Sequence, residues 1–237
     1  MTRRTFVYIV CAPHPRVGVT TTARLLADFF AHQGRAFEGF DTDPHETPFA
    51  ERFPREAKVI DLGAIQGQIS LFDQLLVLDE TPKIVDVWNR GFHKFFSIVH
   101  DIGFFQEARR QGIEPVLLYL IDETPACLET ALQLSGLWPD LTMVFVSNEG
   151  AMPLDDRAID VLARFPGQLT FQIPALDPLV ARAIEKPGFS LARFALAPPT
   201  DMSLVVRVAL KAWLSRIFAQ FQSFELRIAL NDSEFLR

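Results

Sequence analysis

The sequence predicts a three-layer α/β fold, with a mainly parallel sheet of about seven strands and helices on both faces. Short apolar runs alternate with segments of helical periodicity along most of the chain, which is typical of a parallel sheet. Several runs carry no charged residue, as in Pro115–Ile121, and such runs suit strands that are buried on both faces. The chain has 237 residues, of which 49% are hydrophobic, and this is enough for a large core.

The first predicted strand is Phe6–Cys11, a continuous run of β-branched and aromatic residues that ends in a cysteine. A helix follows at Thr20–Gln33, where large apolar residues recur at helical spacing and Gly34 can end the helix. The same patterns predict further strands at Arg35–Asp41, Lys58–Leu62, Lys83–Trp88, Pro115–Ile121, Leu141–Ser147 and Leu169–Ile173. They predict further helices at Ile65–Leu76, Phe95–Gln111, Pro125–Leu134, Asp155–Phe165 and Ser203–Phe221. This order implies right-handed crossovers, with ligands at the carboxyl ends of the strands.

The domain organisation is predicted to be one α/β domain, residues 1–195, and a C-terminal helical segment, residues 196–237, packed on it. The segment Ala195–Asp201, which contains Ala-Pro-Pro-Thr-Asp, marks the turn between the two. No internal repeat and no low-complexity tract is present. The turn is therefore interpreted as a hinge and not as a linker between independent domains.

Composition excludes several classes of protein. The net charge is −6, which argues against a general nucleic-acid coat. No apolar stretch reaches about 18 residues, so no membrane-spanning helix is expected. Two cysteines without a Cys/His cluster indicate neither a disulfide framework nor a zinc site. Arg3-Arg4 before an apolar run is similar to a twin-arginine export signal, but the run is short and lacks a cleavage site, so an opening strand in a cytoplasmic protein is preferred.

The segment between the first strand and the first helix has features of a phosphate-binding loop. In such loops, backbone N–H groups converge on an anion at a helix N-terminus, and glycine permits the close approach. Here Gly18 precedes the hydroxyl-bearing run Thr20–Thr22. The loop resembles the deviant P-loop of the ParA/MinD family, Lys-Gly-Gly-x-Gly-Lys-Thr-Thr. Gly18, Thr20 and Thr21 match this pattern, whereas His14, Pro15, Arg16 and Val19 replace the signature lysine, two glycines and the catalytic lysine.

Three further segments resemble the same family. The sequence Asp-Thr-Asp-Pro at Asp41–Pro44 is similar to the family's second-strand motif. Asp86, within the predicted strand Lys83–Trp88, sits where the family's Walker B aspartate ends a strand, with Asp61 as the rival for this role. Asn148 follows the strand whose end carries the family's adenine-reading asparagine. The resemblance covers roughly residues 5–195 and implies a P-loop NTPase-like fold.

The resemblance implies a site for ATP or ADP with Mg²⁺. Nucleotide would be bound by Arg16, Gly18, Thr20, Thr21 and Asn148, and the metal by Thr20 and Asp86. Asp43 matches the switch residue that orders magnesium and the attacking water, and the alternative is a structural turn with Pro44.

The replaced residues predict weak or lost hydrolysis. Val19 carries no charge to balance the transferring phosphoryl group, Pro15 lacks an N–H and Arg16 is bulky where a glycine is expected. Arg16 or His14 could supply part of the missing positive charge. The chain is accordingly expected to act as a dimeric positioning or assembly switch. The alternative is a pseudo-ATPase, a regulatory module that binds protein and no nucleotide.

Two surfaces are candidates for partners. Ser203–Phe221 combines an apolar stripe with basic residues, and a helix of this kind either packs on the sheet or lies on an anionic membrane. A group of phenylalanines in the helix Phe95–Gln111 and just before it forms either core or the face of a homodimer or heteromeric complex. Nucleic acid is the less favoured partner.

Overall fold

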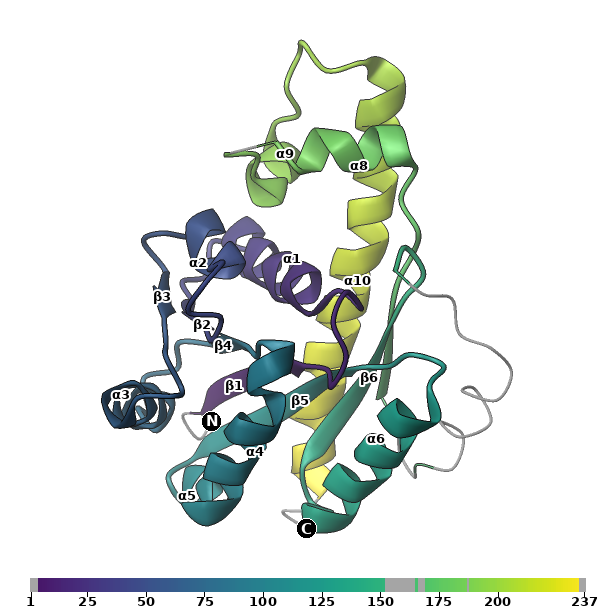
Figure 1. The fold of residues 1–237 in the computed structure, drawn as a ribbon. Coiled ribbons are helices and arrows are strands. Elements are labelled where there is room, and N and C mark those ends of the chain that lie inside the picture. The colour runs from purple at the N-terminus through teal and green to yellow at the C-terminus, as the bar shows by residue number, and fades with distance from the viewer. Residues whose placement is uncertain (1–3, 152–164, 166–168, 187, 235–237) are drawn as a thin grey trace.

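The computed structural model describes residues 4–151, 165, 169–186 and 188–234. Within these residues seven parallel strands form one sheet in the order β3-β2-β4-β1-β5-β6-β7, with helices on both faces (Figure 1). This confirms the predicted fold class. The strands are β1 (Thr5–Cys11), β2 (Glu38–Asp41), β3 (Ala57–Val59), β4 (Lys83–Asp86), β5 (Ile113–Leu120), β6 (Thr142–Asn148) and β7 (Leu169–Ile173).

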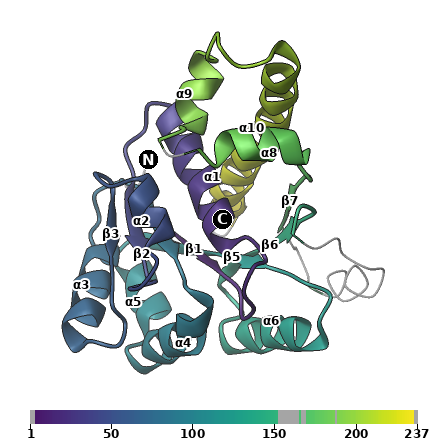
Figure 2. The ribbon, with the colours of Figure 1, turned by 45° about the horizontal axis from the view of Figure 1, so that its top comes forward.

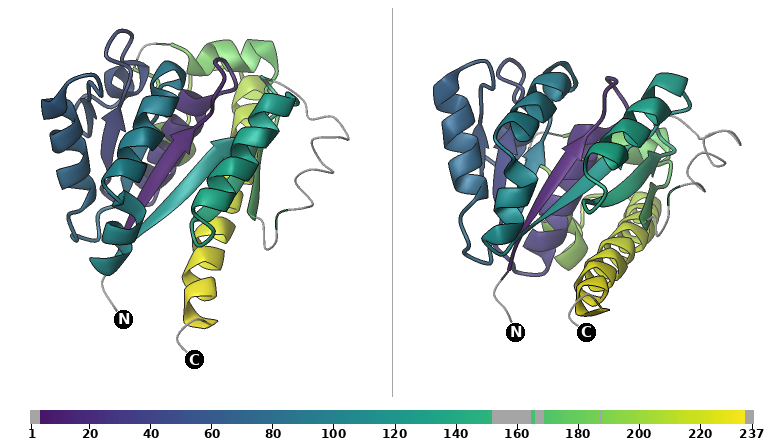
Figure 3. Two further views of the ribbon diagram at one scale, coloured as in Figure 1. Left: turned by 60° about the horizontal axis from the view of Figure 1, so that its bottom comes forward. Right: turned by 90° about the horizontal axis from the view of Figure 1, so that it is seen from below.

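Helices cover the sheet as two separate layers (Figure 2). One layer contains α1 (Val19–His32), α8 (Pro178–Ile184), α9 (Leu191–Leu196) and α10 (Leu204–Glu234). The other contains α3 (Ile65–Leu75), α4 (Phe92–Asp101), α5 (Phe104–Arg110) and α6 (Pro125–Leu137), as the views from below show (Figure 3). The short α2 (Pro48–Arg52) follows β2, and a 3-10 turn, η1 (Asn89–Gly91), precedes α4.

The central strand β1 shows why its sequence is apolar without alternation. Tyr8 and Val10 belong to the core on the α1 and α10 side, whereas Val7, Ile9 and Cys11 belong to the core on the α4 and α6 side. All five are at most 1% exposed. A strand with helices on both faces buries every side chain, so period-two polarity disappears.

The predicted helix over residues 95–111 is wrong in one respect, because the structure contains two helices there. Gly103 separates α4 from α5 and adopts a φ of +62°. This left-handed conformation interrupts a helix, and glycine adopts it without a steric penalty. The segment predicted as the helix 155–165 lies, apart from Phe165, outside the described residues. Neither α2, α8 nor α9 was predicted, because helices of five to seven residues show no clear period.

The C-terminal helix is longer than predicted and packs on the sheet. It extends to Glu234 instead of residue 221, and Phe224 and Ile228 continue its buried stripe. The stripe shares one core cluster with β1 and α1: Leu210, Trp213, Leu214, Ile217, Phe218 and Phe221. These side chains are therefore unavailable to a membrane in this structure. The division of the chain after residue 195 remains a prediction.

The phenylalanines offered above as a partner face are core residues. They belong to α4 and α5 and are at most 7% exposed: Phe92, Phe95, Phe96, Phe104 and Phe105. Of the two interpretations, core and interface, the structure shows the first. None of the helices in the described part of the chain is long and apolar enough to cross a membrane.

Candidate functional site

Residues 12–18 connect β1 to α1 and border a cavity of about 290 Å³. The cavity lies at the carboxyl ends of β1 and β4, which are neighbours in the middle of the sheet. In parallel sheets this edge is where ligands bind. Its lining comes from the loop, the first turn of α1 and the segment after β4: His14, Pro15, Arg16, Gly18, Val19, Thr20, Thr21, Asp86, Val87, Trp88 and Asn89. We call it the loop cavity.

Gly18 is required by both its backbone and its surroundings. Its φ is +102°, and a Cβ at this position would lie 2.2 Å from Nδ2 of Asn148. That Nδ2 donates a hydrogen bond to the carbonyl of Val17 at 3.2 Å. Oδ1 of Asn148 accepts from the N–H of Gly150 at 3.2 Å. The Asn148 side chain thus joins the end of β6 to the loop.

Asp86, the last residue of β4, is the most unusual group on the wall of the loop cavity. It is 3% exposed, and its Oδ2 has no hydrogen-bond partner among the described residues. Burial raises the pKa of Asp86 from its ordinary 3.8 to about 7, against the effect of a hydrogen bond with the Thr20 side chain. A buried, unpartnered carboxylate oxygen needs a proton or a cation.

The rival for the Walker B position lies elsewhere. Asp61 is exposed and accepts a hydrogen bond from the N–H of Gly63 at 2.8 Å. It does not line the loop cavity. Of the two aspartates, the structure brings only Asp86 to the loop, because Asp86 ends β4, a direct neighbour of β1, whereas Asp61 follows β3 at the edge of the sheet.

The Asp-Thr-Asp-Pro segment builds a turn. Asp41 accepts hydrogen bonds at Oδ2 from the N–H groups of Phe49 and Ala50, at 2.8 and 3.0 Å, and so satisfies the N-terminus of α2. Oδ1 of Asp43 accepts from the N–H groups two and three residues later, at 2.9 and 3.2 Å. This is the geometry of an Asx turn, the structural alternative for Asp43. Asp43 is 7% exposed and does not line the loop cavity.

A histidine–aspartate pair at the loop was not predicted. Nδ1 of His14 lies 2.6 Å from Oδ2 of Asp122, a carboxylate that is 2% exposed and follows β5. Burial favours its neutral form, but hydrogen bonds from Thr124 and His14 outweigh burial and lower the pKa of Asp122. The position of Asp122 after a predicted strand was the available signal, since the ends of adjacent parallel strands meet.

The other residues predicted to contact phosphate differ in how far they face the loop cavity. Arg16 lines the loop cavity, is exposed and has a φ of +65°. Val19 is half-buried and packs against the core beneath α1. Thr20 and Thr21 stand in the first turn of α1 and line the cavity. Five of the predicted site residues therefore line the loop cavity: Arg16, Gly18, Thr20, Thr21 and Asp86. Asn148 does not line this cavity but lies beside Gly18.

A second cavity, of about 260 Å³, adjoins the first, and Thr21 lines both. Asn148, Pro174, Leu176 and Trp213 contribute to its walls. It also contains the polar groups Arg24, Asp28 and Arg52, which sequence reasoning did not identify. Nη2 of Arg24 donates to the carbonyl of Pro48 at 2.6 Å, while its buried Nε has no hydrogen-bond partner among the described residues. Burial raises the pKa of Asp28, which accepts from the N–H of Ala192 at 2.9 Å.

Three solved structures are similar to this chain. A nucleotide-binding protein from Archaeoglobus fulgidus, solved in complex with ADP, superposes with a TM-score of 0.51 at 15% identity, covering 79% of this chain and 88% of that one. The MinC:MinD complex of Aquifex aeolicus gives a TM-score of 0.49 at 13% identity and 90% and 95% coverage. MinD of the same organism gives 0.49 at 15% identity and 90% and 96% coverage. No family model and no curated protein matches the sequence. At 15% identity, the likeness to the Archaeoglobus protein establishes the fold and nothing finer.

Proposed function

We propose that the loop cavity binds the phosphates of ATP or ADP together with Mg²⁺, and that hydrolysis is slow or lost. The observation that carries this proposal is the buried, unpartnered Oδ2 of Asp86 beside the Thr20 hydroxyl. A carboxylate and a hydroxyl are hard oxygen donors of the kind that magnesium prefers. The fold shared with a protein solved in complex with ADP supports the same proposal.

The residues at the loop cavity form a metal side and a phosphate side. On the metal side, Asp86 and Thr20 lie together at the cavity wall. Mg²⁺ bound there would neutralise charge on the phosphate oxygens. On the phosphate side, the first turn of α1 offers backbone N–H groups, which attract anions. Arg16 is a cation on this wall, and the imidazole of His14 lies on the same wall.

The second cavity is proposed to receive the base. Thr21 borders both cavities, so a nucleotide with its phosphates in the loop cavity can extend into it. Leu176 and Trp213 provide apolar wall area for a planar ring, and the Arg24 and Asp28 side chains provide polar groups. Asn148 lies at the junction and would act on the base only after releasing Val17.

Slow hydrolysis follows from the side chains at the phosphates. Catalysis of phosphoryl transfer depends on positioning and on charge that stabilises the transition state. Val19 provides no charge, and Asp43 is engaged in its turn. Arg16 and His14 can hold phosphate in the ground state, which favours binding more than rate.

Titration calorimetry with ADP, ATP and GTP, with and without Mg²⁺, tests the proposal. Magnesium-dependent binding that is lost in Thr20→Val and in Asp86→Asn, and kept in the control Asp61→Asn, is expected. A ligand at 100 times its Kd should also stabilise the protein by about 2.7 kcal/mol. A wild-type turnover on the order of 1 per second that disappears in Asp43→Ala would contradict the claim of slow hydrolysis.

The pseudo-ATPase is the second candidate, and specific contacts favour it. Both polar atoms of Asn148 and one carboxylate oxygen of Asp43 are engaged within the protein. Pro15 supplies no backbone N–H to the loop. If none of the nucleotides binds in the calorimeter, the loop is a scaffold and this second function replaces the first.

The dimeric positioning or assembly switch is proposed from the resemblance of the loop and of the Asp-Thr-Asp-Pro segment to the ParA/MinD family. Sedimentation velocity with and without ATP tests it, and a nucleotide-dependent change in mass is expected.

A membrane contact through α10 is proposed only for its first turns, where Leu204, Val205 and Val208 are 61–77% exposed. Cosedimentation of Val205→Glu with anionic vesicles tests that contact.

A further inference from the structure

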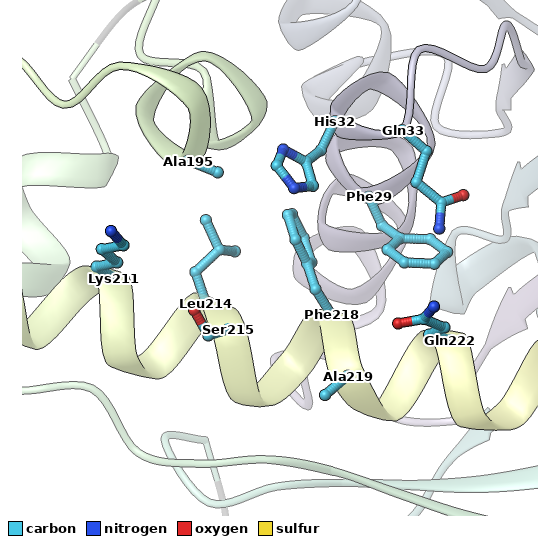
Figure 4. Close-up of a pocket in the computed structure, with 10 residues that line it drawn as sticks. All are labelled: Phe29, His32, Gln33, Ala195, Lys211, Leu214, Ser215, Phe218, Ala219 and Gln222. Carbon is cyan, nitrogen blue, oxygen red and sulfur yellow. The ribbon is translucent and has the colours of Figure 1, made fainter.

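Two histidines line cavities and differ in how far their imidazoles are available to a ligand. His32 lines a depression of about 440 Å³ between α1, α9 and α10, where Leu214 and Phe218 extend toward it (Figure 4). Its ring packs on Phe218 with ring centroids 5.2 Å apart, and its buried Nδ1 has no hydrogen-bond partner among the described residues. His14, in contrast, lines the loop cavity with a side chain that is 34% exposed. A ligand in the loop cavity can therefore reach the imidazole of His14.

The register of two strands brings His14 to Asp122. Cys11 of β1 pairs with Tyr119 of β5, and His14 and Asp122 each lie three residues after their member of this pair. Nδ1 of His14 is consequently 2.6 Å from Oδ2 of Asp122. A proline precedes His14 and another follows it, and prolines restrict the backbone on both sides. The backbone at His14 is thus held by its neighbours, and its ring is held by Asp122.

The hydrogen bonds of Asp122 decide which imidazole nitrogen carries a proton. Oδ1 of Asp122 accepts from the N–H of Thr124 at 2.8 Å and from the Thr124 hydroxyl. Burial opposes the ionisation of Asp122, but the hydrogen bonds from Thr124 and His14 outweigh burial and lower its pKa. Asp122 is therefore ionised at neutral pH, and an ionised carboxylate only accepts hydrogen bonds. Nδ1 of His14 must be the donor in this contact.

The position of this proton determines what Nε2 of His14 can do. The hydrogen bonds of the imidazole within the described part of the chain are made by Nδ1, which leaves Nε2 to the cavity. While the ring is neutral, its one proton is on Nδ1, and Nε2 has a lone pair that repels phosphate oxygens. Once the ring is protonated, Nε2 donates. Without an ionised partner at Nδ1, a neutral imidazole can place its proton on Nε2 and donate there at any pH.

We propose that His14 is a proton-linked phosphate ligand and that Asp122 is its positioning residue. Asp122 keeps one proton on Nδ1, so Nε2 donates to a phosphate oxygen in the loop cavity only when the imidazole carries both protons. The affinity for phosphate therefore rises as the pH falls from 8 to 6, the range in which histidine ordinarily changes its charge. The inference rests on the proposed binding of phosphate in the loop cavity and adds its regulation by pH.

Other charged groups around His14 also affect the binding of an anion. Arg16, on the same loop, lines the cavity and keeps its charge throughout this pH range. Asp86 lines the opposite side, and because burial raises its pKa to about 7, it also gains negative charge as the pH rises. Glu123, next to Asp122 in the sequence, is exposed and does not line the cavity. The experiment therefore has to separate the contribution of His14 from that of Asp86.

Calorimetry with ADP and with tripolyphosphate, each with Mg²⁺ at pH 6, 7 and 8, tests the proposal. His14→Lys keeps Asp86 and has a charge that is constant over this range, so it is the reference. Beyond the change in that reference, the wild-type Kd should rise about tenfold between pH 6 and pH 8. In Asp122→Asn the amide can donate to Nδ1 and leave the proton on Nε2, so this extra rise should disappear. The exposed controls Asp140→Asn and His100→Gln should behave as the wild type.

Nitrogen-15 NMR of the histidine side chains gives a readout that needs no ligand. At pH 9 the neutral ring of His14 should carry its proton on Nδ1 in the wild type and on Nε2 in Asp122→Asn. A proton on Nε2 in the wild type would overturn the proposal. So would a pH profile of binding that is the same in the wild type, in His14→Lys and in Asp122→Asn.

The two probes distinguish this inference from the proposed function. ADP binding without the expected pH profiles would overturn the inference and leave the proposed function in place. Tripolyphosphate binding with these profiles, but without ADP binding, would support the inference and remove the nucleotide from the proposed function. Binding of neither probe would overturn both.

Discussion

Replacing Asp86 by asparagine is expected to stabilise the metal-free protein at neutral and alkaline pH. The carboxyl is 3% exposed, and burial raises its pKa from 3.8 to about 7. Between these values the folded chain holds a proton that the unfolded chain releases. The free energy of unfolding of the wild type therefore falls as the pH rises through this range.

The magnitude follows from the shift. One pKa unit corresponds to about 1.36 kcal/mol, so a rise from 3.8 to about 7 corresponds to at most about 4 kcal/mol. An amide has nearly the shape of a protonated carboxyl and has no charge. Wild type and Asp86→Asn should consequently have similar stability near pH 4, and the advantage of the variant should grow toward pH 8.

Equilibrium unfolding in urea with EDTA, at pH 4, 6 and 8, measures this difference. Asp61→Asn serves as the control, because its exposed carboxylate carries no burial penalty. An advantage of Asp86→Asn that does not change between pH 4 and pH 8 would refute the reasoning. Under the proposed function, ADP with Mg²⁺ should stabilise the wild type at pH 8 and leave the variant unaffected.

Three further outcomes are expected. Gly18→Ala should lower the free energy of unfolding by about 1–3 kcal/mol, and adding Asn148→Ala should restore only part, because the clash with Nδ2 is removed and the positive φ is kept. Phe221→Ala, at a side chain with 0% exposure, should cost about 3–5 kcal/mol in a urea titration. Hydrogen bonds from Thr124 and His14 lower the pKa of Asp122 in the folded state, so protonation of this carboxylate contributes to the loss of stability in acid. Asp122→Asn should remove that contribution. Titration of unfolding from pH 5 to pH 2 checks this last outcome, and identical pH profiles of wild type and variant would contradict it.

The strands could be predicted because each depends on a local signal. β1 and β5 are apolar runs whose side chains are buried on both faces of the sheet. Such runs can be recognised in the sequence without knowing which strands pair with them. The break at Gly103 and the end of α10 were missed for different reasons. A glycine inside a helical pattern is compatible with either continuation or interruption. Among the side chains described beyond residue 221, which end at Ile228, Phe224 and Ile228 continue the buried stripe.

Much of the candidate site was also visible in the sequence. Gly18, Thr20 and Thr21 follow the first strand directly, so that strand–loop–helix connectivity places them at one cavity. The pairing of His14 with Asp122, which are 108 positions apart, was not visible, because it depends on β5 lying beside β1. The same applies to Arg24 and Asp28, which look like ordinary helix residues until α2 and α9 pack against α1.

By itself, the sequence determined the fold class, the strands and the position of the loop between β1 and α1, because these depend on periodicity and on neighbouring residues. Only the tertiary structure decided between Asp86 and Asp61, since the order of strands determines which carboxylate lies beside the loop. It also decided that the apolar stripe of α10 is core, because amphipathicity alone does not specify what covers the apolar face. The burial that raises the pKa of Asp86, finally, is created by segments distant in the chain, and no local pattern records it.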